Sequence, residues 1–210
     1  ILCYCWIATS SFAQSCTFLQ RLKADYQKLV GFIQSHEPIP AIKLVDSLSN
    51  QINEQNLQEC PTALWVQFYY GEALEMLGKK TDALGHYYEL VPIAESLEQW
   101  EIAAEIYISM ARTHETLRRR EDCLRNLRKA QELITQHDLP GTYSRLAVRL
   151  SSYHRFFDSL DSARYFAREA IQYGKEYGVQ RSELDGQLLM GILTDSLEAS
   201  IRHFQATVRI

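Results

Sequence analysis

The sequence lacks the residue patterns that most catalytic and metal sites require. Its five cysteines include no Cys-x-x-Cys pair, which leaves the usual zinc and thioredoxin-type sites without support. Its six histidines form neither His-x-x-x-His nor His-Glu-x-x-His, and no glycine-rich phosphate loop is present. No isolated acid pair and no Ser/His/Asp set stands out from the surface charges. We therefore expect a protein that is not an enzyme and that holds no cofactor and no metal.

The charge balance and the apolar stretches argue against two further classes of protein. The net charge of −4 does not favour nucleic acid or an anionic membrane as a partner. The local exception is the basic run Arg118-Arg119-Arg120 with Arg125, Arg128 and Lys129, which we interpret as a helical turn followed by a solvated face. No apolar stretch reaches the length of a membrane span. We expect a membrane link only through a segment outside this sequence.

The chain also lacks the alternation of Val, Ile and Thr that predicts β-strands. Apolar residues recur instead at helical intervals, and turn residues separate the helical segments. Thr81 or Asp82 is the expected N-cap of the fourth helix, and Gly178 the expected C-terminal cap of the eighth. The predicted helices cover 17–35, 41–56, 61–78, 81–97, 99–117, 120–137, 142–157, 160–177, 181–193 and 196–209.

Small residues recur at a fixed spacing along these helices. Successive members of the series are separated by 42, 40 and 40 residues. A helical sequence with such a period predicts a stack of helical hairpins, one for each unit. A stack of this kind offers a surface for binding and, by default, no catalytic pocket. The series consists of Ala41, Ala83, Cys123 and Ala163.

The segment from Leu64 to Leu90 resembles a tetratricopeptide repeat (TPR), through its small residues Gly71 and Ala83 and its aromatic Tyr87. In that family the small residue at the position of Gly71 lets the two helices of a hairpin touch. The small residue at the position of Ala83 lets the next helix pack closely, and the aromatic residue at the position of Tyr87 fills the gap between hairpins. Ala111, Ser151 and Gly191 follow Gly71 at intervals of forty, in place of the usual period of about 34. Over residues 17–210 the resemblance implies an all-α, right-handed superhelix of antiparallel helical hairpins.

The two ends of the chain depart from a simple repeat. The last unit, from Gly191, is short, and its register stays open. The sequence stops at Ile210 inside a predicted helix without the polar cap that helical stacks need. We expect residues 14–210 to be a repeat domain that is truncated at its C-terminal end.

The first residues predict export. Residues 1–8 carry no charge, and Ser11 and Ala13 have the spacing that signal peptidase requires. We interpret residues 1–13 as the remnant of a signal peptide that is cleaved after Ala13. The alternative is a buried first helix that is apolar.

Three cysteines follow this segment. Cys16 and Cys60 each lie at the start of a first helix in neighbouring hairpins, so we expect a disulfide between them. Lipid attachment at Cys16 is a weaker alternative because Gln14-Ser15 matches poorly. We expect Cys123 to be buried and reduced.

In the TPR family the first helices of the hairpins line a groove. An extended peptide or a partner helix would suit the mixture of aromatic and charged residues there, and a solvated face of paired charges is the alternative. The family's Lys/Asn clamp for a terminal carboxylate is absent from the matching places. The predicted binding residues are Trp65, Phe68, Glu72, Glu75, Arg112, Glu115, Arg145 and Arg155. The other groove positions are Met76, Glu105, Ile108, Thr116, Val148, Ser152 and Phe156.

The signal-like start, the longer repeat and the absent catalytic groups resemble the extracytoplasmic repeat regions of bacterial signalling proteins. There a membrane helix leads to a histidine kinase or a DNA-binding helix-turn-helix. The resemblance implies a non-catalytic sensing or oligomerising domain that binds a protein or peptide and self-associates. Its location would be periplasmic or on the extracytoplasmic face of the membrane. The alternatives are a free-standing cytosolic TPR adaptor or peptide receptor, and the accessory domain of an enzyme.

Overall fold

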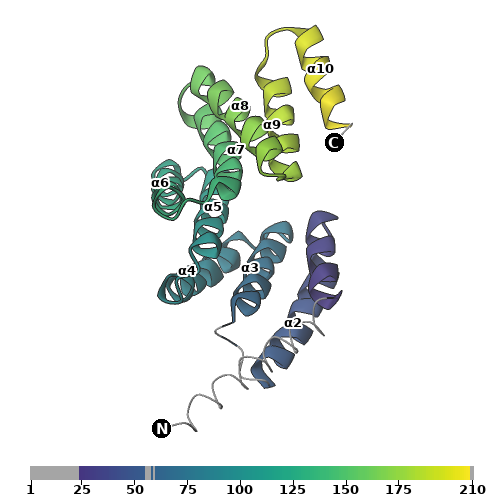
Figure 1. Cartoon of the computed structure of the whole chain (residues 1–210), viewed down its shortest axis with the longest axis vertical. Helices are drawn as coiled ribbons and strands as arrows, with labels where there is room; N and C mark the ends of the chain where they lie inside the picture. The colour runs from purple at the N-terminus through teal and green to yellow at the C-terminus, as the bar shows by residue number, and fades with distance from the viewer. Residues whose placement is uncertain (1–23, 55–57, 59, 209–210) are drawn as a thin grey trace. The chain divides into compact units, whose positions relative to one another are not determined.

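The computed structural model describes residues 24–54, 58 and 60–208 of the chain, and within them the fold is all-α (Figure 1). A helical segment at 24–34 precedes nine helices, and no strand occurs in the described part. The helices are α2 (Pro38–Glu54), α3 (Pro61–Met76), α4 (Lys80–Ser96), α5 (Trp100–Thr116), α6 (Arg120–Gln136), α7 (Pro140–Phe157), α8 (Leu160–Glu176), α9 (Gln180–Leu193) and α10 (Leu197–Thr207).

The chain divides into two compact units, residues 1–97 and residues 98–210. In unit 1 the helical segment 24–34 and α2 form one hairpin, and α3 and α4 form the next. Leu29, Val45 and Val66 are buried in one apolar cluster that joins the two hairpins. The apolar stripes of these helices therefore build a core along the stack, as expected for packed hairpins.

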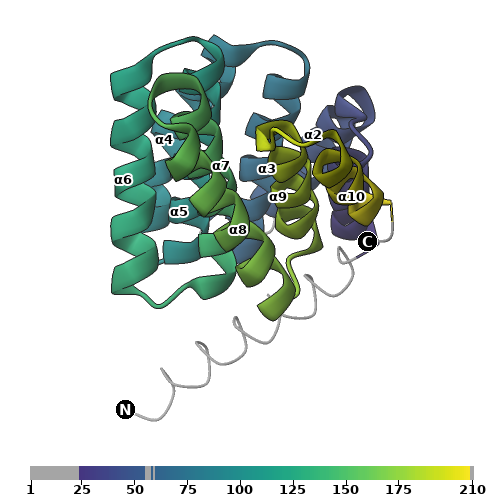
Figure 2. The same cartoon turned by 90° about the horizontal axis from the view of Figure 1, so that it is seen from above.

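Unit 2 contains three hairpins, α5–α6, α7–α8 and α9–α10, arranged in two layers. The first helices touch in sequence, α5 with α7 and α7 with α9, whereas the second helices α6 and α8 do not contact each other. Figure 2 shows α6 and α9 on opposite sides of this unit, with α7 and α8 between them. The second helices contact the first helix of the following hairpin instead, α6 with α7 and α8 with α9.

The turns repeat every twenty residues. Helices α4 to α9 begin at 80, 100, 120, 140, 160 and 180, so each hairpin consists of two equal halves. After each of the helices α3, α4, α5, α6 and α8, one residue of the turn has a left-handed backbone conformation. These residues are Gly78, Glu98, Arg118, Asp138 and Gly178. That conformation ends a helix by letting the chain turn back toward the last carbonyls. The prediction that Gly178 caps α8 is confirmed.

The predicted series of small residues lies at the helix contacts. Ala41, Ala83 and Ala163 are fully buried, and Cys123 is 1% exposed. Ser151 is buried as well, and its hydroxyl donates a hydrogen bond to the carbonyl of Ala163 at 2.8 Å. Close approach of the backbones explains the small side chains, since a larger one would force the helices apart.

The register of the last hairpin is fixed by Gly191 and Phe204. A Cβ added to Gly191 would stand 2.8 Å from Cζ of Phe204, which is the relationship that Gly71 has with Tyr87. Ser196 caps α10 by accepting a hydrogen bond from the amide of Ala199. Tyr87 follows Gly71 by sixteen residues in the α3–α4 hairpin, whereas Phe204 follows Gly191 by fewer. The aromatic position therefore comes earlier in the last hairpin.

One predicted cap is wrong. The N-cap of α4 is Lys79, without a side-chain hydrogen bond, and both Thr81 and Asp82 lie inside the helix. The left-handed residue Gly78 brings the chain into the helix earlier than a Thr or Asp cap would. Asp82 still contributes, because a negative charge in the first turn interacts favourably with the helix dipole.

Candidate protein-interaction surface

The first helices carry the predicted binding residues, and the structure divides these into packing positions and exposed positions. Phe68 on α3 has the same place in its repeat as Ile108 on α5 and Val148 on α7. All three are buried, with exposures of 0%, 5% and 3%. These positions pack the hairpins together, so the expectation that Phe68 presents its ring to a partner is corrected.

In unit 1 the aromatic side chains of α3 form a cluster. The ring of Phe68 lies edge-on to Trp65 with centroids 5.5 Å apart, and Tyr69 stacks on Trp65 at 6.0 Å. Trp65 and Glu75 are half-buried, whereas Glu72 is buried and accepts a hydrogen bond from the hydroxyl of Tyr87 at 3.3 Å. Trp65 and Glu75 are the members of this set that retain exposed surface.

In unit 2 an ion pair joins the start of α5 to the start of α7. Arg145 Nε lies 3.0 Å from Glu105 Oε2, and the side chain of Glu105 is 3% exposed while that of Arg145 is 41% exposed. A buried carboxylate needs a partner because its desolvation costs several kcal/mol. Arg145 therefore links the two helices while part of its side chain stays exposed.

Further along the same helices, one carboxylate lies among four arginines. Burial raises the pKa of Glu115, and the nearby guanidinium groups of Arg149, Arg155, Arg118 and Arg112 oppose that rise. Glu115 is itself 9% exposed. The structure thus brings together three of the predicted residues, Arg112, Glu115 and Arg155. It adds Arg118 and Arg149, which the prediction omitted.

Phe156 covers this end of the surface. The Cζ atoms of Arg155 and Arg118 lie 4.1 and 4.9 Å from the centre of its ring, and the ring is 41% exposed. Both distances are within the range of a cation–π contact. An exposed aromatic ring and two guanidinium groups therefore occupy one small area at the ends of α5 and α7.

A buried cysteine and histidine lie near the start of α6 without the features of a nucleophilic pair. Burial raises the pKa of Cys123 to about 12, and Glu115 adds to the rise. Burial lowers the pKa of His114, and its Nδ1 lies 4.0 Å from Oδ2 of Asp122. A thiol with so high a pKa is protonated at neutral pH and is a poor nucleophile. Cys123 is buried, as predicted.

No group of His, Cys, Asp and Glu that could hold a metal ion occurs in the residues that the structure describes. Likewise, none of the described helices is both long and apolar enough to cross a membrane.

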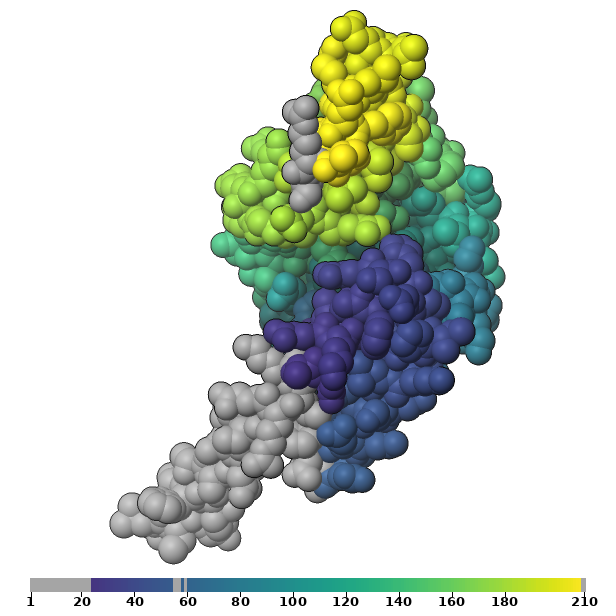
Figure 3. All heavy atoms as spheres, turned by 90° about the vertical axis from the view of Figure 1, so that its right-hand side faces the viewer, coloured from purple at the N-terminus to yellow at the C-terminus, as the bar shows by residue number. Residues whose placement is uncertain are grey.

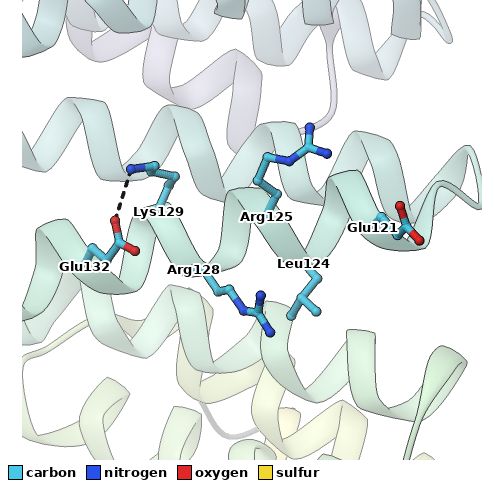
Figure 4. A pocket seen from close by; sticks show the side chains of 6 residues that line it. All are labelled: Glu121, Leu124, Arg125, Arg128, Lys129 and Glu132. Atoms are coloured by element: carbon cyan, nitrogen blue, oxygen red, sulfur yellow. Dashed lines mark hydrogen bonds and ion pairs between the residues drawn. The ribbon is translucent and has the colours of Figure 1, made fainter.

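A shallow depression on the outer face of α6 coincides with part of the basic run (Figure 4). All the residues that line it come from this single helix: Glu121, Leu124, Arg125, Arg128, Lys129 and Glu132. Lys129 pairs with Glu132 at 3.1 Å, and Arg125 pairs with Asp122 at 3.0 Å. Such exposed pairs within one helix describe a solvated face rather than a binding site.

The last helix has an exposed apolar side. None of the described residues of α10 is buried, and Figure 3 shows the helix, in yellow, on the face that is turned to the viewer. Leu197, Ile201 and Phe204 are 77%, 45% and 40% exposed.

Two predicted features fall at least partly outside the described residues. Cys16 and the segment 1–13 are not described, so the signal peptide and the disulfide stay predictions. Cys60, the other half of the predicted disulfide, is half-buried before α3.

Comparison with known proteins gives a structural likeness only. No family model and no curated protein matches the sequence. Solved structures do match, among them a putative kinesin light chain of Podosopora anserina with nearly identical TPR-like repeats and a single-residue variant of the same protein. Each of these two has a TM-score of 0.55 and 13% sequence identity over 90% of this chain, and the match covers 95% and 93% of their own chains. The chain therefore has the fold of a TPR-like helical repeat protein.

Proposed function

We propose that this chain is a non-catalytic protein-interaction domain that binds a peptide or a partner helix on the first-helix side of unit 2. The observation that carries the proposal is the surface of α7, the first helix that contacts both α5 and α9. There Phe156 is exposed, and Arg145 and Arg155 are half-buried. Arginine and aromatic residues contribute much of the binding energy in protein interfaces. The TPR-like fold supports the proposal because such repeats typically bind proteins.

A selection of displayed random peptides of about 12 residues tests this function. We expect peptides that bind the folded chain and that lose binding when Arg145, Arg155 and Phe156 are replaced together. A matched triple variant, with Arg128→Gln, Arg168→Gln and Tyr165→Ala on α6 and α8, should retain binding. If no peptide is enriched, or if both triple variants lose binding equally, the proposed function is wrong.

We also propose that the domain is the exported, sensing or oligomerising part of a larger bacterial signalling protein. The support comes from the sequence: the uncharged residues 1–8, the spacing of Ser11 and Ala13, and the forty-residue repeat. A partner could shift the equilibrium between two shapes of a repeat stack, provided that it binds one shape more tightly. No chemical step is then needed for signalling.

The mass of the protein purified from its own cells tests the location. Export predicts a chain that begins at Gln14, together with a Cys16–Cys60 disulfide that reduction removes. An intact segment 1–13 with free thiols would support the alternative of a cytosolic adaptor. The remainder of the open reading frame tests the signalling role, since the proposal requires a membrane helix and an output module to be encoded there.

A further inference from the structure

We propose that Arg118, Arg155 and Phe156 form a subsite for an acidic segment of a partner protein. A carboxylate would bind the two guanidinium groups, and a neighbouring apolar side chain would cover the ring. The inference rests on the proposed function, because it names the chemistry of the partner at the same first-helix surface of unit 2.

The geometry places two cations beside one exposed ring. Arg118 occupies the turn after α5, with a backbone φ of 58°, and Arg155 lies in the last turn of α7. Their Cζ atoms are 4.9 and 4.1 Å from the centre of the Phe156 ring. The left-handed turn and the ring contacts thus hold two guanidinium groups from different hairpins at one site.

The two guanidinium groups differ in exposure, and one carboxylate of the chain lies near both. The Nε of Arg155 is buried and has no hydrogen-bond partner among the residues that the structure describes. Glu115 is the carboxylate near both groups, and it is also near Arg112 and Arg149. Arg118 is exposed, so its guanidinium can meet a carboxylate of a partner directly, and the half-buried Arg155 adds a second positive charge beside it.

The surroundings favour an acidic protein segment over a nucleic acid. The net charge of the chain is −4, which opposes a long polyanion and its many phosphate contacts. The centre of the subsite is an exposed phenyl ring, and Arg120 of the neighbouring basic run donates its Nε hydrogen bond to the hydroxyl of Tyr153 at 3.2 Å. Planar guanidinium groups bind carboxylates through two parallel hydrogen bonds, and an aromatic ring beside them accommodates an apolar neighbour.

The test uses the amino-acid composition of the peptides that are enriched from the random displayed library. Selection against the wild-type chain should enrich Asp and Glu next to an apolar residue. Selection against Arg118→Gln/Arg155→Gln should lose that acidic enrichment, whereas the control Arg128→Gln/Arg168→Gln, with the same change of net charge on α6 and α8, should keep it. Circular dichroism and thermal melts establish that both variants are folded.

Affinity measurements on one enriched peptide complete the test. Replacing its acidic residues by Asn or Gln should weaken binding about tenfold, which is about 1.4 kcal/mol, and raising NaCl from about 50 to 300 mM should weaken it as well. Phe156→Ala should also weaken binding. Inorganic phosphate and polyuridylic acid serve as competitors, and we expect neither to displace the peptide at millimolar phosphate or equal charge concentration.

Three results overturn the inference alone, and a fourth overturns it together with the proposed function. Enriched peptides without acidic residues would leave the protein-interaction function intact and remove the acidic partner. Equal loss in the Arg128→Gln/Arg168→Gln control would show non-specific attraction, and tighter binding of polyuridylic acid would assign the subsite to a nucleic acid. Failure to enrich any peptide would instead refute the proposed function, and the inference with it.

Discussion

Gly71 on α3 lies directly against the ring of Tyr87 on α4. A Cβ added to Gly71 would stand 2.6 Å from Cζ of Tyr87 and nearer still to Cε1. The next repeat has Ala111 in place of glycine and Leu127 in place of tyrosine. The small residue is larger there, and the residue at the aromatic position is smaller. The two positions therefore share one volume in each hairpin.

We expect Gly71→Ala to lower the free energy of unfolding by about 1–3 kcal/mol, because the fully buried ring of Tyr87 would have to shift. Gly85→Ala on α4 is the control. Its Cβ would have no neighbour within 4 Å, and we expect a gain of up to about 1 kcal/mol from helix propensity. Urea denaturation measures both.

The double variant Gly71→Ala/Tyr87→Leu recreates the Ala111–Leu127 combination. We expect it to be more stable than the sum of the two single changes predicts, since each change compensates for the other. Strict additivity would show that the two positions do not share one volume.

The free energy of unfolding should fall as the pH is lowered below about 6.5. Burial lowers the pKa of His86 in the folded chain, and its hydrogen bond to the carbonyl of Gln67 at 2.8 Å only partly offsets this. The unfolded chain therefore binds more protons in this range, and stability declines as the pH decreases. Burial also lowers the pKa of His114 and His203, so these residues add to the decline.

The variant His86→Asn should flatten part of this decline between about pH 7.5 and 5.5. Thermal melts at several pH values measure the effect. His36→Asn is the control, because His36 is exposed and its left-handed backbone suits Asn. A decline that is equally steep in wild type and in His86→Asn would contradict the assignment.

The two described cysteines should differ in their reaction with iodoacetamide. Burial raises the pKa of Cys123 to about 12, so little thiolate forms, and the side chain is 1% exposed. Cys60 is half-buried at the start of α3. In the reduced, folded protein we expect Cys60 to be alkylated first and Cys123 only after unfolding, as peptide mass spectrometry would show. Labelling of both at one rate in the native state would contradict this account.

Much of the fold was predictable because small residues report helix contacts. Ala83, Cys123 and Ala163 mark places where backbones approach, and this requirement recurs with the geometry of the hairpin. The register of the last hairpin was not predictable from that period, because its aromatic position comes earlier in the sequence. The repeated Asp-Ser-Leu at 158–160 and 195–197 was the available signal, since each serine caps the following helix.

The candidate surface was only partly predictable. Successive side chains on a helix are rotated by about 100° about its axis. The sequence of a first helix alone therefore does not show whether a given side chain faces another helix or solvent. The sequence therefore predicts Phe68 on the binding face, although its side chain packs in the core. Arg118 is absent from the predicted binding residues because it lies in a turn rather than on a first helix, and its contact with Phe156 joins two hairpins that are distant in sequence.

Amide hydrogen exchange with a selected peptide tests whether the first-helix side of unit 2 is the interaction surface. Binding there predicts slower exchange in α5 and α7, including the turn at Arg118 that carries one side of the subsite. It also predicts no change in the outer helix α6 away from that turn. Protection that is confined to α6 and α8, or that is absent from α5 and α7 when the peptide is saturating, would contradict it.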